Sequence, residues 1–230
     1  MTTVEERLAS VRSRIDTACL ACGRVPSEVS LLAVSKTFPV ADVLEACQAG
    51  QLAFGENYIQ EAIEKMAALR HIPLQWHCIG PVQSNKTRLV AEHFDWMHTV
   101  DRLKIAQRLS DQRPAGMPDL QVCIQVNVDA GVHKSGIAPE EVLALAQAVV
   151  RLPRIRLRGL MCIPEPAKDA ESARQVFARV ADLLGECQQA GLAMDTLSMG
   201  MSDDLEAAVA AGSTMVRVGS AIFGARQQKP

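Results

Sequence analysis

Apolar residues at the start of the chain recur three or four positions apart. The pattern runs from Val4 to Cys22, and Thr3 and Glu6 have the spacing of a capping box, in which each side chain bonds to the other residue's backbone amide. This arrangement predicts an amphipathic helix that ends near Gly23.

Beyond this helix, short apolar runs typical of buried strands alternate with helical patterns. The eight runs cover residues 31–35, 52–56, 75–80, 94–100, 120–128, 155–163, 195–200 and 214–219. Their starts lie about 20 to 40 residues apart, which is the repeat of βα units joined by right-handed crossovers. Eight such units predict an α/β fold, a (β/α)8 TIM barrel, to which the first helix is an addition.

The main alternative is an open doubly wound sheet. Such a sheet normally carries a glycine-rich dinucleotide turn after an early strand, and no GxGxxG occurs in this chain. Residues 111–119 contain Pro and Gly but form too short a stretch for a domain linker. We therefore expect a single barrel domain over residues 1–230.

Composition limits the classes of partner. The 230 residues are 48% apolar, which is enough for one large core. A net charge of −2 and eight aromatic residues provide neither the basic stripe of a duplex-binding protein nor the aromatic surface of a single-strand-binding protein. No apolar run approaches the roughly 18 residues that span a bilayer, and the first residues do not resemble a signal peptide. We expect a cytoplasmic protein without a nucleic-acid or membrane partner.

The chain has seven cysteines, most of them in apolar segments, and we expect reduced core thiols rather than disulfides. Cys19 and Cys22 form a CxxC, but no second pair or suitably spaced histidine completes a zinc site. We interpret the pair as part of a helical face.

Lys36 directly follows the first predicted strand, at the rim where barrel proteins of this kind hold their ligands. A lysine whose stem passes apolar walls can form a Schiff base, because desolvation lowers the pKa of the amine and frees its lone pair. A lysine that simply leaves the strand for water is the competing interpretation, and the residue alone does not decide between them.

The last two strands lead into loops that could bind an anion. Gly200 and Ser202 follow the seventh strand, where a turn and a helix start would present amides and a hydroxyl to a phosphate. Gly219 and Ser220 offer a second set of donors after the eighth strand. In the alternative interpretation, Ser202 only caps its own helix and Gly200 only makes the turn.

Arg217 interrupts the apolar eighth strand. A buried charge is costly, so this guanidinium must either face a wet cavity or pair with an acceptor. A structural ion pair is the alternative to a role in a ligand site.

Six segments together resemble the pyridoxal 5′-phosphate (PLP) homeostasis protein family, and the likeness spans nearly the whole chain. They read LLAVSKTFP, FGENYIQEA, WHCIGPVQSNK, HKSGI, LRGLMCIP and LSMGMSDDLEAAVAAGSTMVRVGSAIFGAR. The resemblance implies a barrel related to the N-terminal domain of alanine racemases, with PLP as cofactor in a Schiff base on Lys36. It also implies no efficient catalytic turnover.

The resemblance also assigns residues to the PLP site. Asn57 would lie near the ring and Arg217 would face the pyridine nitrogen. Ser202, Gly219 and Ser220 would hold the phosphate, and Met199, Gly200 and Met201 would line that loop. Lys134 is a candidate secondary contact for PLP. His77 is instead expected to lie in the barrel wall with its hydrogen bonds made within the protein.

Three functions remain open on the sequence. The first is PLP homeostasis, in which a monomer binds PLP reversibly, with transient delivery to PLP-dependent apoenzymes left open. The second is a PLP-dependent amino-acid racemase of low activity, but Tyr58 is the single tyrosine and we expect no second domain after the eighth strand. The third is an aldolase- or isomerase-like enzyme acting on a sugar phosphate without PLP.

Overall fold

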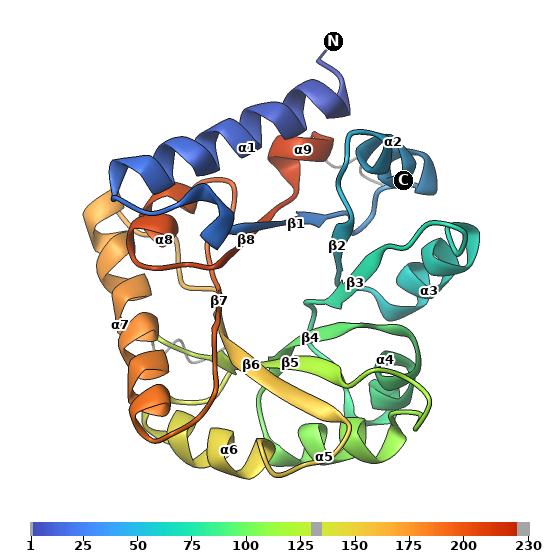
Figure 1. The fold of residues 1–230 in the computed structure, drawn as a ribbon, viewed down its shortest axis with the longest axis vertical. Coiled ribbons are helices and arrows are strands. Elements are labelled where there is room, and N and C mark those ends of the chain that lie inside the picture. The colour runs from blue at the N-terminus through green and yellow to red at the C-terminus, as the bar shows by residue number, and fades with distance from the viewer. Residues whose placement is uncertain (1, 130–134, 225–230) are drawn as a thin grey trace.

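The structure is a computed structural model that describes residues 2–129 and 135–224. Eight parallel strands form a closed barrel in chain order, and β8 pairs with β1 to complete it (Figure 1). The strands are β1 Ser30–Val34, β2 Ala53–Glu56, β3 Gln75–Cys78, β4 Trp96–Val100, β5 Leu120–Val126, β6 Ile155–Cys162, β7 Thr196–Ser198 and β8 Met215–Val218. The predicted (β/α)8 barrel is confirmed, and the open sheet is excluded.

Helices surround the barrel and cover its outer face (Figure 1). Those in the described residues are α1 Val4–Ala21, α2 Val40–Gln48, α3 Ile59–Ala68, α4 Thr87–His93, α5 Leu103–Gln112, α6 Val142–Val149, α7 Ala170–Gln189, α8 Leu205–Ala210 and α9 Ser220–Phe223. Short 3-10 helices lie at Pro26–Glu28, Ser84–Lys86 and Pro139–Glu141. No helix in these parts of the chain is long and apolar enough to cross a bilayer.

The capping box predicted for α1 is present. Thr3 Oγ1 accepts from the amide of Glu6 at 3.1 Å, and Glu6 Oε2 accepts from the amide of Thr3 at 2.8 Å. Cys19 lies on the buried face of α1, whereas Cys22 is its exposed C-cap, which confirms the helical interpretation of the CxxC. All seven cysteines are free thiols.

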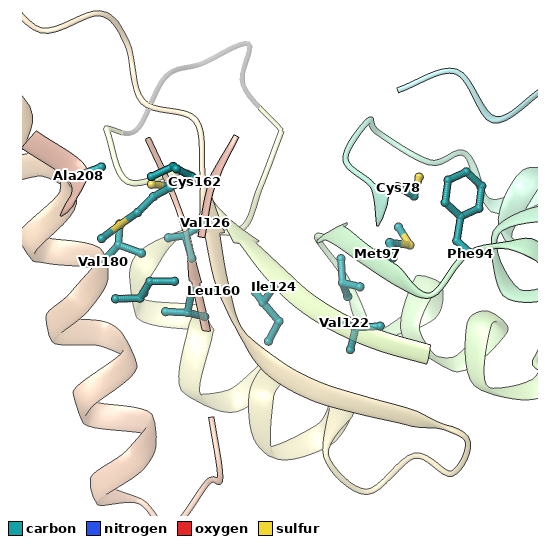
Figure 2. Close-up of a cluster of buried hydrophobic side chains, with 14 of the residues drawn as sticks. Cys78, Phe94, Met97, Val122, Ile124, Val126, Leu160, Cys162, Val180 and Ala208 are labelled. Atoms are coloured by element: carbon teal, nitrogen blue, oxygen red, sulfur yellow. The ribbon is translucent and has the colours of Figure 1, made fainter. Parts of the chain in front are cut away.

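The main hydrophobic core lies between the outer face of the barrel and the helices. Figure 2 shows part of it, including Ile124 of β5, Leu160 and Cys162 of β6, and Val180 of α7. Since strand side chains alternate between the two faces of a sheet, the other set of each strand points into the barrel. This inner set includes polar residues as well as two small apolar clusters.

Candidate functional site

A cavity of about 210 Å³ opens where the strands end. Its lining residues are Val34, Lys36, Asn57, Ile79, Ile163, Met201, Ser202, Asp203, Arg217, Gly219 and Ser220. Seven of the nine residues that the sequence assigned to a site therefore meet in one cavity, although they come from both ends of the chain. The position agrees with the ligand sites of barrel proteins, at the C-terminal ends of the strands.

The two remaining residues, Met199 and Gly200, shape the loop after β7 without lining the cavity. Met199 is fully buried in the main core. Gly200 has a φ of +95°, and a Cβ built on it would lie 2.5 Å from the Cβ of Ala208. Only glycine fits this backbone conformation and this close packing against α8.

Ser202 does not cap the following helix, so that interpretation of its role is wrong. The N-cap residue of α8 is Asp204, whose carboxylate accepts a hydrogen bond from the amide of Met201. The hydroxyl of Ser202 instead lies 3.3 Å from the hydroxyl of Ser220 at the start of α9. The loops after β7 and β8 thus adjoin, as the sequence predicted.

Arg217 is 4% exposed and reaches the cavity from inside the barrel. Its guanidinium donates to the carbonyl and hydroxyl oxygens of Ser198 and to the carbonyl oxygen of Cys162. None of these partners is a carboxylate, so the structural ion pair is not found within the described residues. Three of its five N–H groups are used in this way, and burial lowers the pKa of the guanidinium.

Both peptide groups that flank Lys36 are held by side chains of α3. Lys65 Nζ donates to the carbonyl oxygen of Ser35 at 2.7 Å, and the amide of Thr37 donates to Glu61 Oε1 at 2.7 Å. Thr37 has a φ of +70°, a conformation that costs a β-branched residue energy and therefore needs support from its surroundings. The half-buried Lys36 lies between these two fixed points.

Lys65 also bonds to Glu56 and Glu61, at 2.7 Å each. Glu56 is fully buried and accepts a second hydrogen bond, from Ser35 Oγ, at 2.7 Å. Burial raises the pKa of Glu56, while Lys65 and Ser35 oppose this shift. Sequence reasoning missed this cluster, for which the available signal was the placement of a lysine on the apolar face of a predicted helix, four residues after Glu61.

Asn57 brings an unused acceptor to the cavity. Its Oδ1 atom is buried and has no hydrogen-bond partner in residues 2–129 and 135–224. A buried polar atom without a partner is costly, so this position is suited to a ligand that donates to it.

The added helix α1 packs against α8 and α9, the two helices that follow the loops carrying Ser202 and Gly219 (Figure 1). Arg14 donates to the carbonyl oxygen of Ser202 at 2.9 Å and pairs with Glu206 of α8 at 2.8 Å. Arg7 donates to the carbonyl oxygen of Ile222 in α9. One helix therefore supports the loops after β7 and β8 together.

Two other residues named by the sequence analysis, His77 and Tyr58, lie elsewhere. His77 is buried in the barrel and bonded to His98 and Gln75, which confirms its expected place in the barrel wall. Tyr58 is 57% exposed and does not line the cavity. Lys134 lies outside the described residues.

Comparison with known proteins agrees with this geometry. A family model for the alanine racemase N-terminal domain matches residues 8–227. The pyridoxal phosphate homeostasis proteins of Pseudomonas aeruginosa and Escherichia coli K12 are 59% and 54% identical to the chain, over 98% of its length and 97% and 98% of theirs. The chain belongs to the pyridoxal phosphate homeostasis protein family. The resemblance found in the sequence is thereby confirmed.

Solved structures place this homeostasis protein family in a wider fold group. PipY of Synechococcus elongatus PCC7942, in a structure with PLP bound, is 39% identical with a TM-score of 0.84 and covers 96% of this chain and all of its own. Alanine racemase from Corynebacterium glutamicum, at 18% identity and a TM-score of 0.68, shares the fold over 95% of this chain but only 61% of its own. The racemase-like barrel is thus shown for this chain.

Proposed function

We propose that this chain binds PLP in the cavity at the C-terminal mouth of the barrel and serves to keep PLP available at a controlled concentration. The observation that carries this proposal is the meeting of the Lys36 amine, the paired hydroxyls of Ser202 and Ser220, and the Arg217 guanidinium in one cavity. The relatives' names and the PLP-bound structure of PipY support it.

The donor set fits the chemistry of PLP. The hydroxyls of Ser202 and Ser220 are close enough to share one phosphate. Two N–H groups of Arg217 have no acceptor within the described residues and could donate to the pyridine nitrogen. When bound, PLP supplies an aldehyde that an amine can attack.

Lys36 is the proposed attachment point. Its neutral amine adds to the aldehyde carbon, a C=N bond replaces the C=O bond, and one water molecule leaves. The reaction is reversible by water, which allows the protein to release PLP as well as to hold it. Because α3 fixes the backbone on both sides of Lys36, little ordering of the chain is needed when the bond forms.

The other residues support binding without efficient turnover. Arg217 cannot accept a proton from the ring nitrogen, so the ring stays largely neutral and is a weak electron sink. Racemisation also needs a second acid/base group opposite the lysine, and Tyr58 is outside the cavity lining. The relatives are accordingly named homeostasis proteins rather than enzymes.

Reduction with borohydride followed by mass spectrometry tests the ligand and the residue together. We expect one phosphopyridoxyl group on Lys36 and loss of the visible absorption band. Lys36→Ala should not take the label, whereas the control Lys104→Ala, at an exposed position of α5, should take it. A protein that ignores added PLP would contradict the proposal and favour a sugar-phosphate enzyme.

Two further measurements address the competing and finer functions. Rapid solvent-deuterium exchange at Cα of alanine by the PLP-loaded protein would favour a racemase. Arg217→Gln should weaken PLP retention and shift the absorption spectrum without unfolding the barrel. Transfer to apoenzymes, the monomeric state and the cytoplasmic location stay predictions.

A further inference from the structure

A chain of buried hydrogen bonds runs through the barrel behind Arg217. Ser198 Oγ, which accepts from Arg217 at 2.8 Å, lies 2.8 Å from Nδ1 of His98. Nε2 of His98 lies 2.9 Å from Nδ1 of His77, and Nε2 of His77 lies 2.9 Å from Oε1 of Gln75. The four links join β8, β7, β4 and β3 across the barrel interior.

Arg217 and Ser198 together favour one direction for the protons in this series of hydrogen bonds. A guanidinium can only donate, so Ser198 Oγ accepts from it, and Nδ1 of His98 is the acceptor within reach of the hydroxyl's own proton. His98 then carries its proton on Nε2 and donates to His77, which carries its proton on Nε2 and donates to Gln75. With the opposite direction, the hydroxyl proton of Ser198 would have no acceptor within the described residues.

Both histidines must be neutral for this arrangement, since an imidazolium has no acceptor nitrogen. Burial lowers the pKa of His77 to about 3, and burial together with His77 and Arg217 lowers the pKa of His98 well below its usual value. His77 also stacks on Trp96, with ring centroids 5.2 Å apart and planes 9° from parallel. Packing therefore holds the plane of the His77 ring in addition to its hydrogen bonds.

The chain ends at the far mouth of the barrel. Gln75 is exposed at the first residue of β3 and borders a cleft with Ser30 and Thr214, opposite the cavity that Lys36 lines. Ser198, His98 and His77 are all buried, so the chain forms a satisfied polar axis through an interior that apolar side chains usually fill. Apolar side chains at these positions would stabilise the interior without the desolvation cost of three polar groups. A role in the ligand site therefore explains the buried hydrogen bonds better than stability does.

We propose that His98, supported by His77, is a positioning residue for Arg217: it takes the hydroxyl proton of Ser198, so that the Ser198 oxygen faces the guanidinium and fixes its plane beside the cavity. This inference rests on the proposed function only for its consequence, which is that the remaining N–H groups of Arg217 stay aligned with the pyridine nitrogen of PLP. Neither histidine touches the ligand itself.

Variants at position 98 separate positioning from packing. His98→Leu removes the acceptor, whereas His98→Gln supplies both an acceptor and a donor. Cys123→Ala alters a buried side chain on β5 that takes no part in the series of hydrogen bonds from Arg217 to Gln75. The readouts are the rate at which PLP leaves the loaded protein and the ¹⁵N resonance of isotopically labelled pyridine nitrogen.

We expect His98→Leu to release PLP about tenfold faster, as for the loss of one buried hydrogen bond, and to move the ¹⁵N resonance. His98→Gln and Cys123→Ala should stay within about twofold of the unmodified protein, well below that tenfold effect. A folded His98→Leu protein with the original rate and resonance would overturn the inference.

A second measurement needs no variant. Long-range ¹H–¹⁵N spectra of the purified protein should show His77 and His98 as neutral rings protonated on Nε2, and protonation of either on Nδ1 would overturn the inference even if His98→Leu does not fold. Because this readout does not require PLP, it is independent of the proposed function. Failure of the latter would appear instead as an unlabelled Lys36 in the unmodified protein.

Discussion

Lys65 Nζ lies 2.7 Å from the carbonyl oxygen of Ser35 and donates a hydrogen bond to it. This contact fixes the peptide group before Lys36, and the contact between Glu61 and Thr37 fixes the one after it. The orientation of the proposed attachment lysine therefore depends on a helix packed outside the barrel, not only on the strand that carries it.

Replacing Lys65 with Met should destabilise the protein by about 3–5 kcal/mol, because it leaves the buried carboxylate of Glu56 without its cation. Denaturant unfolding monitored by circular dichroism measures the change. Lys104→Met, on the exposed face of α5, is the control and should unfold as the original protein does. Adding Glu56→Gln to Lys65→Met should restore part of the loss; no difference between the single and double variants would contradict this explanation.

Replacing Arg14 with Met should weaken PLP binding by about three- to tenfold, the effect of losing one charge-assisted hydrogen bond to the loop that carries Ser202. Pyridoxal, which has no phosphate, should bind almost unchanged. Equilibrium titrations with both ligands measure the difference, and Arg179→Met on the exposed face of α7 is the matched control. An equal loss for both ligands would show that α1 does not act through the phosphate loop.

Gly200→Ala should cost about 1–3 kcal/mol from the left-handed backbone alone, and more from the contact with Ala208. The Cβ of Ala208 is the atom that a new Cβ would meet at 2.5 Å. Gly200→Ala combined with Ala208→Gly should therefore lose less stability than the sum of the two single changes. Additive losses in a denaturant series would mean that the contact is relieved by movement of the loop.

The two buried histidines should make the protein sensitive to mild acid. Their pKa values in the folded state lie below the usual 6.5, so below about pH 6.5 the unfolded chain binds protons that the folded chain does not. Stability is then complete above that pH and falls as the pH decreases, by about tenfold in the unfolding equilibrium per pH unit per histidine.

Urea unfolding at pH 7, 6 and 5 checks this expectation. His77→Gln removes one titrating ring and should reduce the slope of stability against pH. Its unfolding equilibrium constant should change about tenfold less per pH unit between pH 6 and 5 than that of the original protein. His93→Gln, at an exposed position at the end of α4, should keep the original slope. An unchanged slope in His77→Gln would show that this histidine does not contribute to the acid sensitivity.

Much of the fold was predictable because local patterns and the barrel agree. The strand that carries Lys36 was expected at residues 31–35 and is observed at Ser30–Val34. The seventh strand was expected at 195–200 but is limited to Thr196–Ser198. Its end is determined by Gly200, whose positive φ turns the chain into the loop before α8, and strand patterns alone do not reveal such a turn.

Part of the cavity was predictable from residues that stand out along the sequence, such as an arginine within an apolar strand, whereas Asn57 and Met201 were assigned through the family resemblance. The supporting contacts were not predictable, because they join residues far apart in the chain. Ser198 and His98 are 100 positions apart, and Lys65 and Ser35 are 30 apart. In sequence these are ordinary side chains, and only the tertiary arrangement of the βα units brings them together.

The barrel closes where β8 pairs with β1, and the cavity lies across that junction: Lys36 follows β1, while Arg217 and Ser220 belong to β8 and α9. A ligand that is bonded to Lys36 on one side of the junction and to Arg217 and Ser220 on the other stabilises the closed barrel. At a free concentration one hundred times its dissociation constant it adds about 2.7 kcal/mol to the intact form. Degradation of this protein by proteases should therefore slow as the concentration of PLP rises. The amount of the protein would then vary with the supply of PLP.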